Sequence, residues 1–187
     1  IKANSNAELD LDFLGWGSLK NIGKYFLRAC NGIVNNITIP TLEPEATIGW
    51  DFLGECGNLQ STEESPISLS PLAKVTNIGE GFMYNCHKIE YLDFSSLTSL
   101  PTANSFGAGI CFGCEKLKSI NSGTLSADIF EADVTTQGQE AINFALSTRP
   151  AESYAGITVN GDNKAAFIAK FPDKDGPSIW RKLVTAE

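Results

Sequence analysis

The chain has 187 residues, a length that fits one domain or one repeat array with a small appendage. Its hydrophobic fraction of 42% and charged fraction of 19% are those of a folded protein, which excludes intrinsic disorder. The net charge of −8, with 14 scattered basic residues, argues against nucleic acid and anionic membranes as partners, and no apolar run approaches the roughly 18 residues of a membrane span.

A first pattern, apolar-x-apolar-x-x-Leu, recurs with a period of about 28 residues. Alternation of apolar and polar residues over a few positions is typical of a strand with one buried face. The pattern therefore predicts short parallel strands, adjacent in chain order, near residues 37–39, 67–69, 92–94 and 120–122. The copies begin at Leu9, Ile37, Ile67, Leu92 and Ile120, and the last copy has a serine in place of its middle apolar residue.

A second pattern alternates with the first and shares its period. It reads apolar-Gly-x-x-apolar-apolar-x-x-Cys, and its four copies span residues 22–30, 48–56, 78–86 and 106–114. The spacing of Ile22, Phe26, Cys30 and Ile33 is that of one helix face, so each copy is expected to form a short helix or helical turn. The glycine at its entry permits either a positive φ or close packing of backbones.

A unit of one strand, one turn and one short helix or helical turn cannot bury its own apolar face. Stacked units bury it together, with a parallel sheet on one side and short helices or turns on the other. The predicted fold class is therefore an α/β repeat solenoid, with the repeat array at residues 1–126.

Residues 127–187 depart from the repeat. The segment Ile157-Thr158-Val159 has the pattern of one more strand, and Trp180, Leu183 and Val184 are suited to seal the open end of the core. We interpret this part as a degenerate final repeat with an irregular C-terminal cap. The alternative is a separate small domain.

At the second pattern the sequence resembles the BspA-like branch of bacterial leucine-rich-repeat proteins. The repeat of that family carries Ile-Gly-x-x-Ala/Phe-Phe/Leu-x-x-Cys-x-x-Leu before a short strand, and the segments 86–94 and 114–120 match this form. The resemblance covers residues 9–126. It departs where one residue is inserted between Cys30 and Val34, and where the polar run 60–65 follows Leu59.

This resemblance implies a right-handed leucine-rich-repeat superhelix in a secreted or surface-exposed bacterial protein, after removal of a signal sequence. We therefore expect a non-catalytic recognition or adhesion module that binds a host or bacterial surface protein or a glycan. The alternative is a structural spacer or assembly domain of a larger surface protein. No cofactor or metal is expected, and an enzyme is disfavoured because the repeat geometry suggests no pocket with convergent titratable groups.

The five cysteines and the single histidine raise the question of a metal, redox or nucleophilic site. Cys30, Cys56, Cys86 and Cys114 hold the same place in each repeat, which favours buried free thiols at a core position. Disulfides between neighbouring units, Cys30–Cys56 or Cys86–Cys114, are the alternative, because the spacing of adjacent strands permits them. His87 is expected to be exposed in the turn after the second pattern.

The strand residues that alternate with buried positions point away from the core and form a candidate ligand surface. This surface is polar and mildly acidic, with one tyrosine, a residue type that is common in binding hot spots. We expect a partner to bind around Tyr91 and Asp93; an ordinary solvated sheet face is the alternative. The candidate residues are Asp10, Asn36, Thr38, Ser68, Tyr91, Asp93, Ser119 and Asn121.

Overall fold

The computed structural model describes residues 18–34, 37, 39, 41–98, 100, 106–107, 113–126, 128, 157–170 and 183–185. In this part of the chain, parallel strands form three small sheets, ordered β1-β2-β4, β3-β5 and β6-β7-β8-β9. Helical structure is scarce, so the arrangement is of the α/β kind with few helices. The elements are β1 Leu19–Ile22, β2 Leu42–Ile48, β3 Gln60–Ser61, the 3₁₀ turn Ser70–Leu72, β4 Asn77–Ile78, β5 Lys88–Ile89, β6 Tyr91–Asp93, β7 Ser119–Asn121, β8 Ile157–Asn160, α1 Lys164–Lys170 and β9 Leu183–Thr185.

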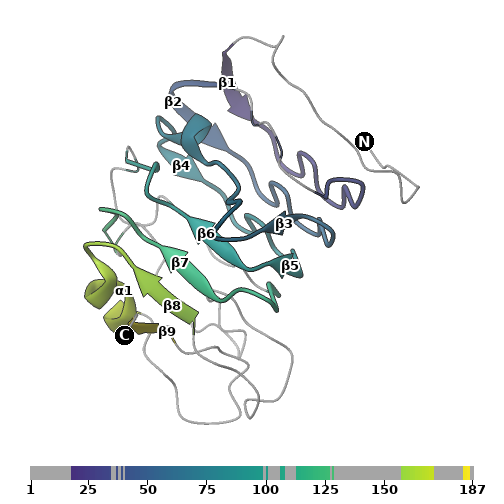
Figure 1. Cartoon of the computed structure of the whole chain (residues 1–187). Coiled ribbons are helices and arrows are strands. Elements are labelled where there is room, and N and C mark those ends of the chain that lie inside the picture. The colour runs from purple at the N-terminus through teal and green to yellow at the C-terminus, as the bar shows by residue number, and fades with distance from the viewer. Residues whose placement is uncertain are drawn as a thin grey trace, which may run out of the picture.

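Chain segments one repeat apart lie side by side, and we call four of them rungs 1 to 4: residues 19–34, 42–61, 77–93, and 106–107 with 113–121. Figure 1 shows the strands following one another in chain order, from β1 near the N-terminal end to β8 and β9 near the C-terminal end. The first apolar residue of each second-pattern copy sets the register. Ile22 pairs with Ile48, Ile48 with Ile78, and Ile78 with Phe106 through an isolated bridge.

Two of the predicted strands are confirmed, together with the extra strand near residue 157. β6 and β7 each lie within one residue of the prediction, and they are parallel, with Leu92 opposite Ile120. β8 follows on the other side of β7 and places Val159 opposite Ile120. Because Leu92, Ile120 and Val159 are all buried, the three strands share one core-facing row.

The strand predicted at residues 67–69 is wrong. Ile67 and Leu69 are buried as the pattern implies, but they lie outside the sheets and lead into the 3₁₀ turn. The amide of Ile67 donates to Ser61 Oγ, six residues earlier in the chain, at 3.0 Å, so it is not available to a neighbouring strand. Rung 2 pairs instead through β3, which lies beside β5.

The strand predicted at residues 37–39 has a similar outcome. Ile37 and Ile39 are buried and belong to no strand, while Thr38 lies outside the described residues. The first copy of the strand pattern, at residues 9–14, also lies outside the described residues.

Of the short helix or helical turn predicted for each second-pattern copy, the structure shows turns and no helix at residues 24–29, 50–55 and 80–85. Alternate residues of rung 1 have positive φ: Tyr25 at 61°, Leu27 at 60° and Ala29 at 57°. The amide of Tyr25 donates to the carbonyl of Trp50, in rung 2, at 2.7 Å. Hydrogen bonds between rungs thus take the place of the i to i−4 bonds of a helix.

A continuous stack of aromatic rings lies under these turns. The ring centroids of Phe26 and Phe52 are 6.2 Å apart and those of Phe52 and Phe82 5.5 Å, and both pairs are stacked. Those of Phe82 and Phe106 are 5.6 Å apart in an edge-to-face contact. Phe52, Phe82 and Phe106 are buried, and Phe26, in rung 1, is partly buried. The stack joins four rungs into one core, and fully burying each such side chain contributes about 1.5–3 kcal/mol.

The repeated glycine is explained by close packing of successive rungs. A Cβ added to Gly49 would lie 2.5 Å from the backbone nitrogen of Lys24, and one added to Gly107 would lie 2.6 Å from that of Glu80. Neither position has the positive φ that would be the other reason for a glycine. Gly23, in the first described rung, has nothing within 4 Å of the same point.

Candidate functional site

The parallel register brings half of the predicted ligand surface together. Tyr91 lies opposite Ser119, and Asp93 lies opposite Asn121. β8 extends both pairs, with Thr158 beside Ser119 and Asn160 beside Asn121. All six side chains are half-buried, and their strand neighbours Leu92, Ile120 and Val159 point into the core. We call these six residues the polar row.

Hydrogen bonds hold the centre of the polar row in place. Asp93 Oδ1 accepts from the Ser95 amide at 2.8 Å and from Asn121 Nδ2 at 3.2 Å. Asn121 Oδ1 accepts from the Gly123 amide at 3.1 Å. In both strands the side chain bonds to the backbone two residues on, which is the Asx turn that ends an extended segment. The two residues therefore shape the turn after each strand as well as facing outward.

The phenol of Tyr91 lies in a partly desolvated, acidic environment. Burial raises its pKa, the Asp93 carboxylate raises it further, and a hydrogen bond with the Asn121 side chain acts in the opposite direction. Glu63 also contributes negative potential to Tyr91. The Glu90 carboxylate nearby in the chain is paired with Lys118 at 2.6 Å. The tyrosine therefore stays neutral at physiological pH, with a ring edge and a hydroxyl group for contact.

The other predicted surface residues are not joined to the polar row. Ser68 is exposed, and its Oγ is 2.9 Å from Ser70 Oγ, next to the 3₁₀ turn and outside any strand. Its expected place beside Tyr91 rested on the strand at 67–69, which does not form. Asp10, Asn36 and Thr38 lie outside the described residues.

The repeated cysteines are buried free thiols, as predicted for Cys30, Cys56, Cys86 and Cys114. Three of them hydrogen-bond a backbone carbonyl of the preceding rung: Cys56 to Leu27 at 3.1 Å, Cys86 to Leu53 at 3.1 Å and Cys114 to Met83 at 3.3 Å. The thiol thus fills a small apolar site and supplies a weak donor to a buried carbonyl.

The burial of these thiols opposes reactivity. Burial raises the pKa of Cys30, raises that of Cys56 to about 12, and raises that of Cys86 well above its usual value. Because the thiolate is the nucleophile and the metal ligand, such thiols are inert. His87, beside Cys86, is exposed as expected, and its Nδ1 lies 3.1 Å from the Gly113 carbonyl, so it links rungs 3 and 4.

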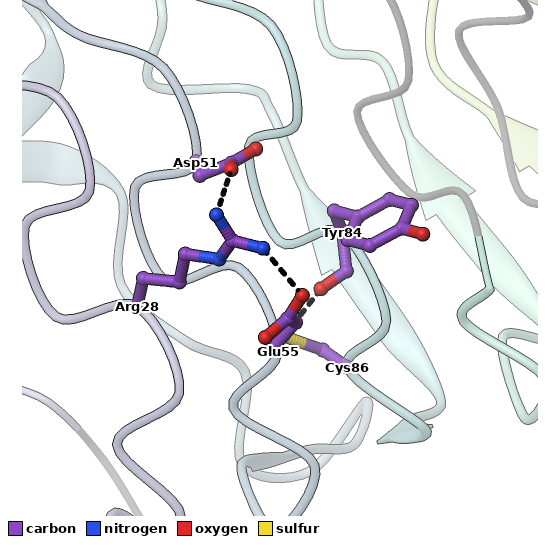
Figure 2. Close-up of polar contacts among 5 residues, drawn as sticks. All are labelled: Arg28, Asp51, Glu55, Tyr84 and Cys86. Atoms are coloured by element: carbon purple, nitrogen blue, oxygen red, sulfur yellow. Dashed lines mark hydrogen bonds and ion pairs between the residues drawn. The ribbon is translucent and has the colours of Figure 1, made fainter. Parts of the chain in front are cut away.

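Sequence reasoning missed a second polar surface, over the turns of rungs 1 to 3. Its centre is Arg28, which pairs with Asp51 at 3.1 Å and with Glu55 at 2.7 Å, beside Tyr84 (Figure 2). Two aromatic side chains are exposed there, Tyr25 at 52% and Trp50 at 44%. We call this region the turn surface. Its residues fall at the x positions of the second pattern, so only a column-by-column alignment of the copies would have found them.

Within the described residues, no group of three or more histidine, cysteine, aspartate or glutamate side chains is arranged to hold a metal ion. The same part of the chain contains no helix that is long and apolar enough to cross a bilayer. No family model matches the sequence, and comparisons with curated proteins and with solved structures find no significant match.

Proposed function

We propose that this protein is a BspA-like leucine-rich-repeat solenoid that serves, at the cell surface or outside the cell, as a non-catalytic recognition module. Its sheet face binds a protein or glycan partner around Tyr91 and Asp93. The repeat signature in the sequence motivates the family, and the backbone hydrogen bonds between the corresponding turns of successive rungs support a stacked array.

The observation that supports a binding surface is the polar row itself. Three parallel strands in register present Tyr91, Ser119 and Thr158 in one line and Asp93, Asn121 and Asn160 in the next. A fixed surface needs little ordering when a ligand arrives, which lowers the entropic cost of binding. Tyrosine supplies contact area, and the carboxylate and amide groups supply donors and acceptors for a polar ligand.

A glycan array and a surface-protein array identify the ligand. For the ligand found, Tyr91→Ala combined with Asp93→Ala should weaken binding at least about tenfold, which is about 1.4 kcal/mol. Ser68→Ala is the matched control, because Ser68 is exposed but outside the polar row, and it should leave the affinity unchanged. Unchanged affinity in a folded double variant would remove the sheet face as the site.

The array experiment also tests the alternative, a structural spacer of a larger surface protein. That alternative is favoured by the use of Asp93 and Asn121 in Asx turns, which explains both residues without a ligand. A spacer predicts no binding on either array. Labelling of intact cells with an antibody to this chain tests the proposed location, since a protein inside the cell would be labelled only after lysis.

A further inference from the structure

The turn surface carries a line of three exposed residues at equivalent positions of successive rungs: Lys24, Trp50 and Glu80. Each immediately follows the repeated glycine, so the three occupy one column of the repeat. Backbone hydrogen bonds of 2.7 Å, from Tyr25 to Trp50 and from Asp51 to Glu80, hold the neighbouring rungs together at this column. The line therefore reads cation, aromatic ring, anion, with each member one rung further along the array.

The two charges at the ends of this line differ from the other charges around them. Arg28 is neutralised by Asp51 and Glu55, at 3.1 and 2.7 Å. Within the described residues, neither Lys24 nor Glu80 takes part in a salt bridge. The Lys24 ammonium instead lies 3.5 Å from the centroid of the Trp50 ring, a cation–π contact at the middle of the line.

A line of this kind is complementary to itself when reversed. A two-fold axis through Trp50 would place Lys24 opposite Glu80 of a second copy, Glu80 opposite Lys24, and the two Trp50 side chains against each other. An isologous interface requires such self-complementarity, because every contact between two different residues occurs twice, once in each direction. A copy in any other orientation would bring Lys24 to Lys24 or leave both charges unmatched.

We propose that the turn surface is a two-fold dimer interface that binds a second copy of this chain, with Trp50 on the axis and Lys24–Glu80 ion pairs on either side. This surface is separate from the polar row, so dimerisation and ligand binding at the sheet face can fail independently.

The interface is small, and small interfaces with exposed ion pairs are weak. Self-association should therefore be detected by sedimentation equilibrium between about 10 µM and about 1 mM protein. It should weaken as salt rises, because the Lys24–Glu80 pairs are screened. Trp50→Ala should reduce the association constant at least about tenfold, as expected for loss of a central aromatic residue.

Charge reversal gives the sharpest test. K24E and E80K should each abolish the dimer, because each puts like charges opposite one another at both ends of the line. The double variant, K24E with E80K, should restore it. An equimolar mixture of the two single variants should also restore it, as a heterodimer in which both ion pairs are made.

A matched control is K118E, which reverses a charge outside the turn surface and should leave the dimer unchanged. A protein that stays monomeric up to about 1 mM would overturn the proposal. A dimer that survives both single reversals, or a mixture of the two that does not associate, would overturn it as well. Far-ultraviolet circular dichroism checks that each variant is folded.

Discussion

Two parts of the repeat follow one period but constrain the sequence in different ways. One is the second-pattern segment with its turn, here called the turn side, and the other is the row of strands β6, β7 and β8, here called the sheet side. On the turn side, isoleucine or phenylalanine, glycine and cysteine recur because each contacts the previous rung: Gly49 leaves no room for a Cβ, and Cys86 donates to a carbonyl. On the sheet side only the alternation recurs, and Tyr91, Ser119 and Thr158 differ at one register position. Packing between rungs therefore fixes residue identity on one side and leaves it free to vary on the other.

The largest expected effect comes from breaking the aromatic stack on the turn side. Phe82→Ala should lower the free energy of unfolding by about 3–5 kcal/mol, because the ring is buried between Phe52 and Phe106. Tyr25→Ala is the control, since that ring is exposed, and it should change stability by less than about 0.5 kcal/mol. Urea denaturation measures both. A loss below about 1 kcal/mol for Phe82→Ala would show that the stack is not core.

The repeated glycine of the second pattern allows the effect of an added methyl group to be compared between rungs. Gly49→Ala should destabilise the protein by about 1–3 kcal/mol, because the new methyl group meets the Lys24 backbone and neither rung can shift without breaking hydrogen bonds. Gly23→Ala should be neutral or slightly stabilising, since nothing lies within 4 Å of its added Cβ. Equal thermal denaturation midpoints for the two variants would contradict the close packing of rungs.

The repeated cysteines are expected to have a smaller, pH-dependent effect on the free energy of unfolding. In the folded protein the pKa of Cys56 is raised to about 12 from the ordinary 9.0, so folding favours the protonated thiol. Its contribution to stability is therefore complete below pH 9 and is lost as the pH rises towards 12, with a slope of roughly 1 kcal/mol per pH unit. Denaturation between pH 8 and pH 11 measures the slope, which should be smaller in Cys56→Ala.

Thiol titration tests, without any variant, whether the repeated cysteines are buried free thiols. Native protein should react little with a thiol reagent at neutral pH, and denatured protein without reductant should show all five equivalents, the number of cysteines in the chain. Fewer than five would reveal a disulfide and contradict free thiols.

How much of this structure could be predicted from the sequence depends on the kind of feature. The pattern of apolar residues in the repeat predicted which side chains are buried even where it misplaced a strand. Ile67 and Leu69, for example, are buried although they form no strand. Strand positions followed only where the backbone amides are free to pair with the neighbouring rung, as in β6 and β7. Ser61 takes the Ile67 amide, and no periodicity reveals such a local hydrogen bond.

The candidate surface shows the same limit. Tyr91, Asp93, Ser119 and Asn121 come together because their strands have the predicted register. Ser68 does not join them, because the strand that would carry it is replaced by β3. The turn surface was missed because a helical pattern assigns the x positions to solvent without saying that Lys24, Trp50 and Glu80 lie in line.

Successive rungs are parallel and in register, and the decisive measurement of this arrangement is the pattern of backbone nuclear Overhauser effects between β6, β7 and β8. We expect contacts that pair Leu92 with Ile120 and Ile120 with Val159, with residue numbers rising in the same direction along all three strands. Strong Hα–Hα contacts typical of antiparallel pairs, with numbers rising in one strand and falling in the next, would contradict it, as would β7 having neighbours other than β6 and β8.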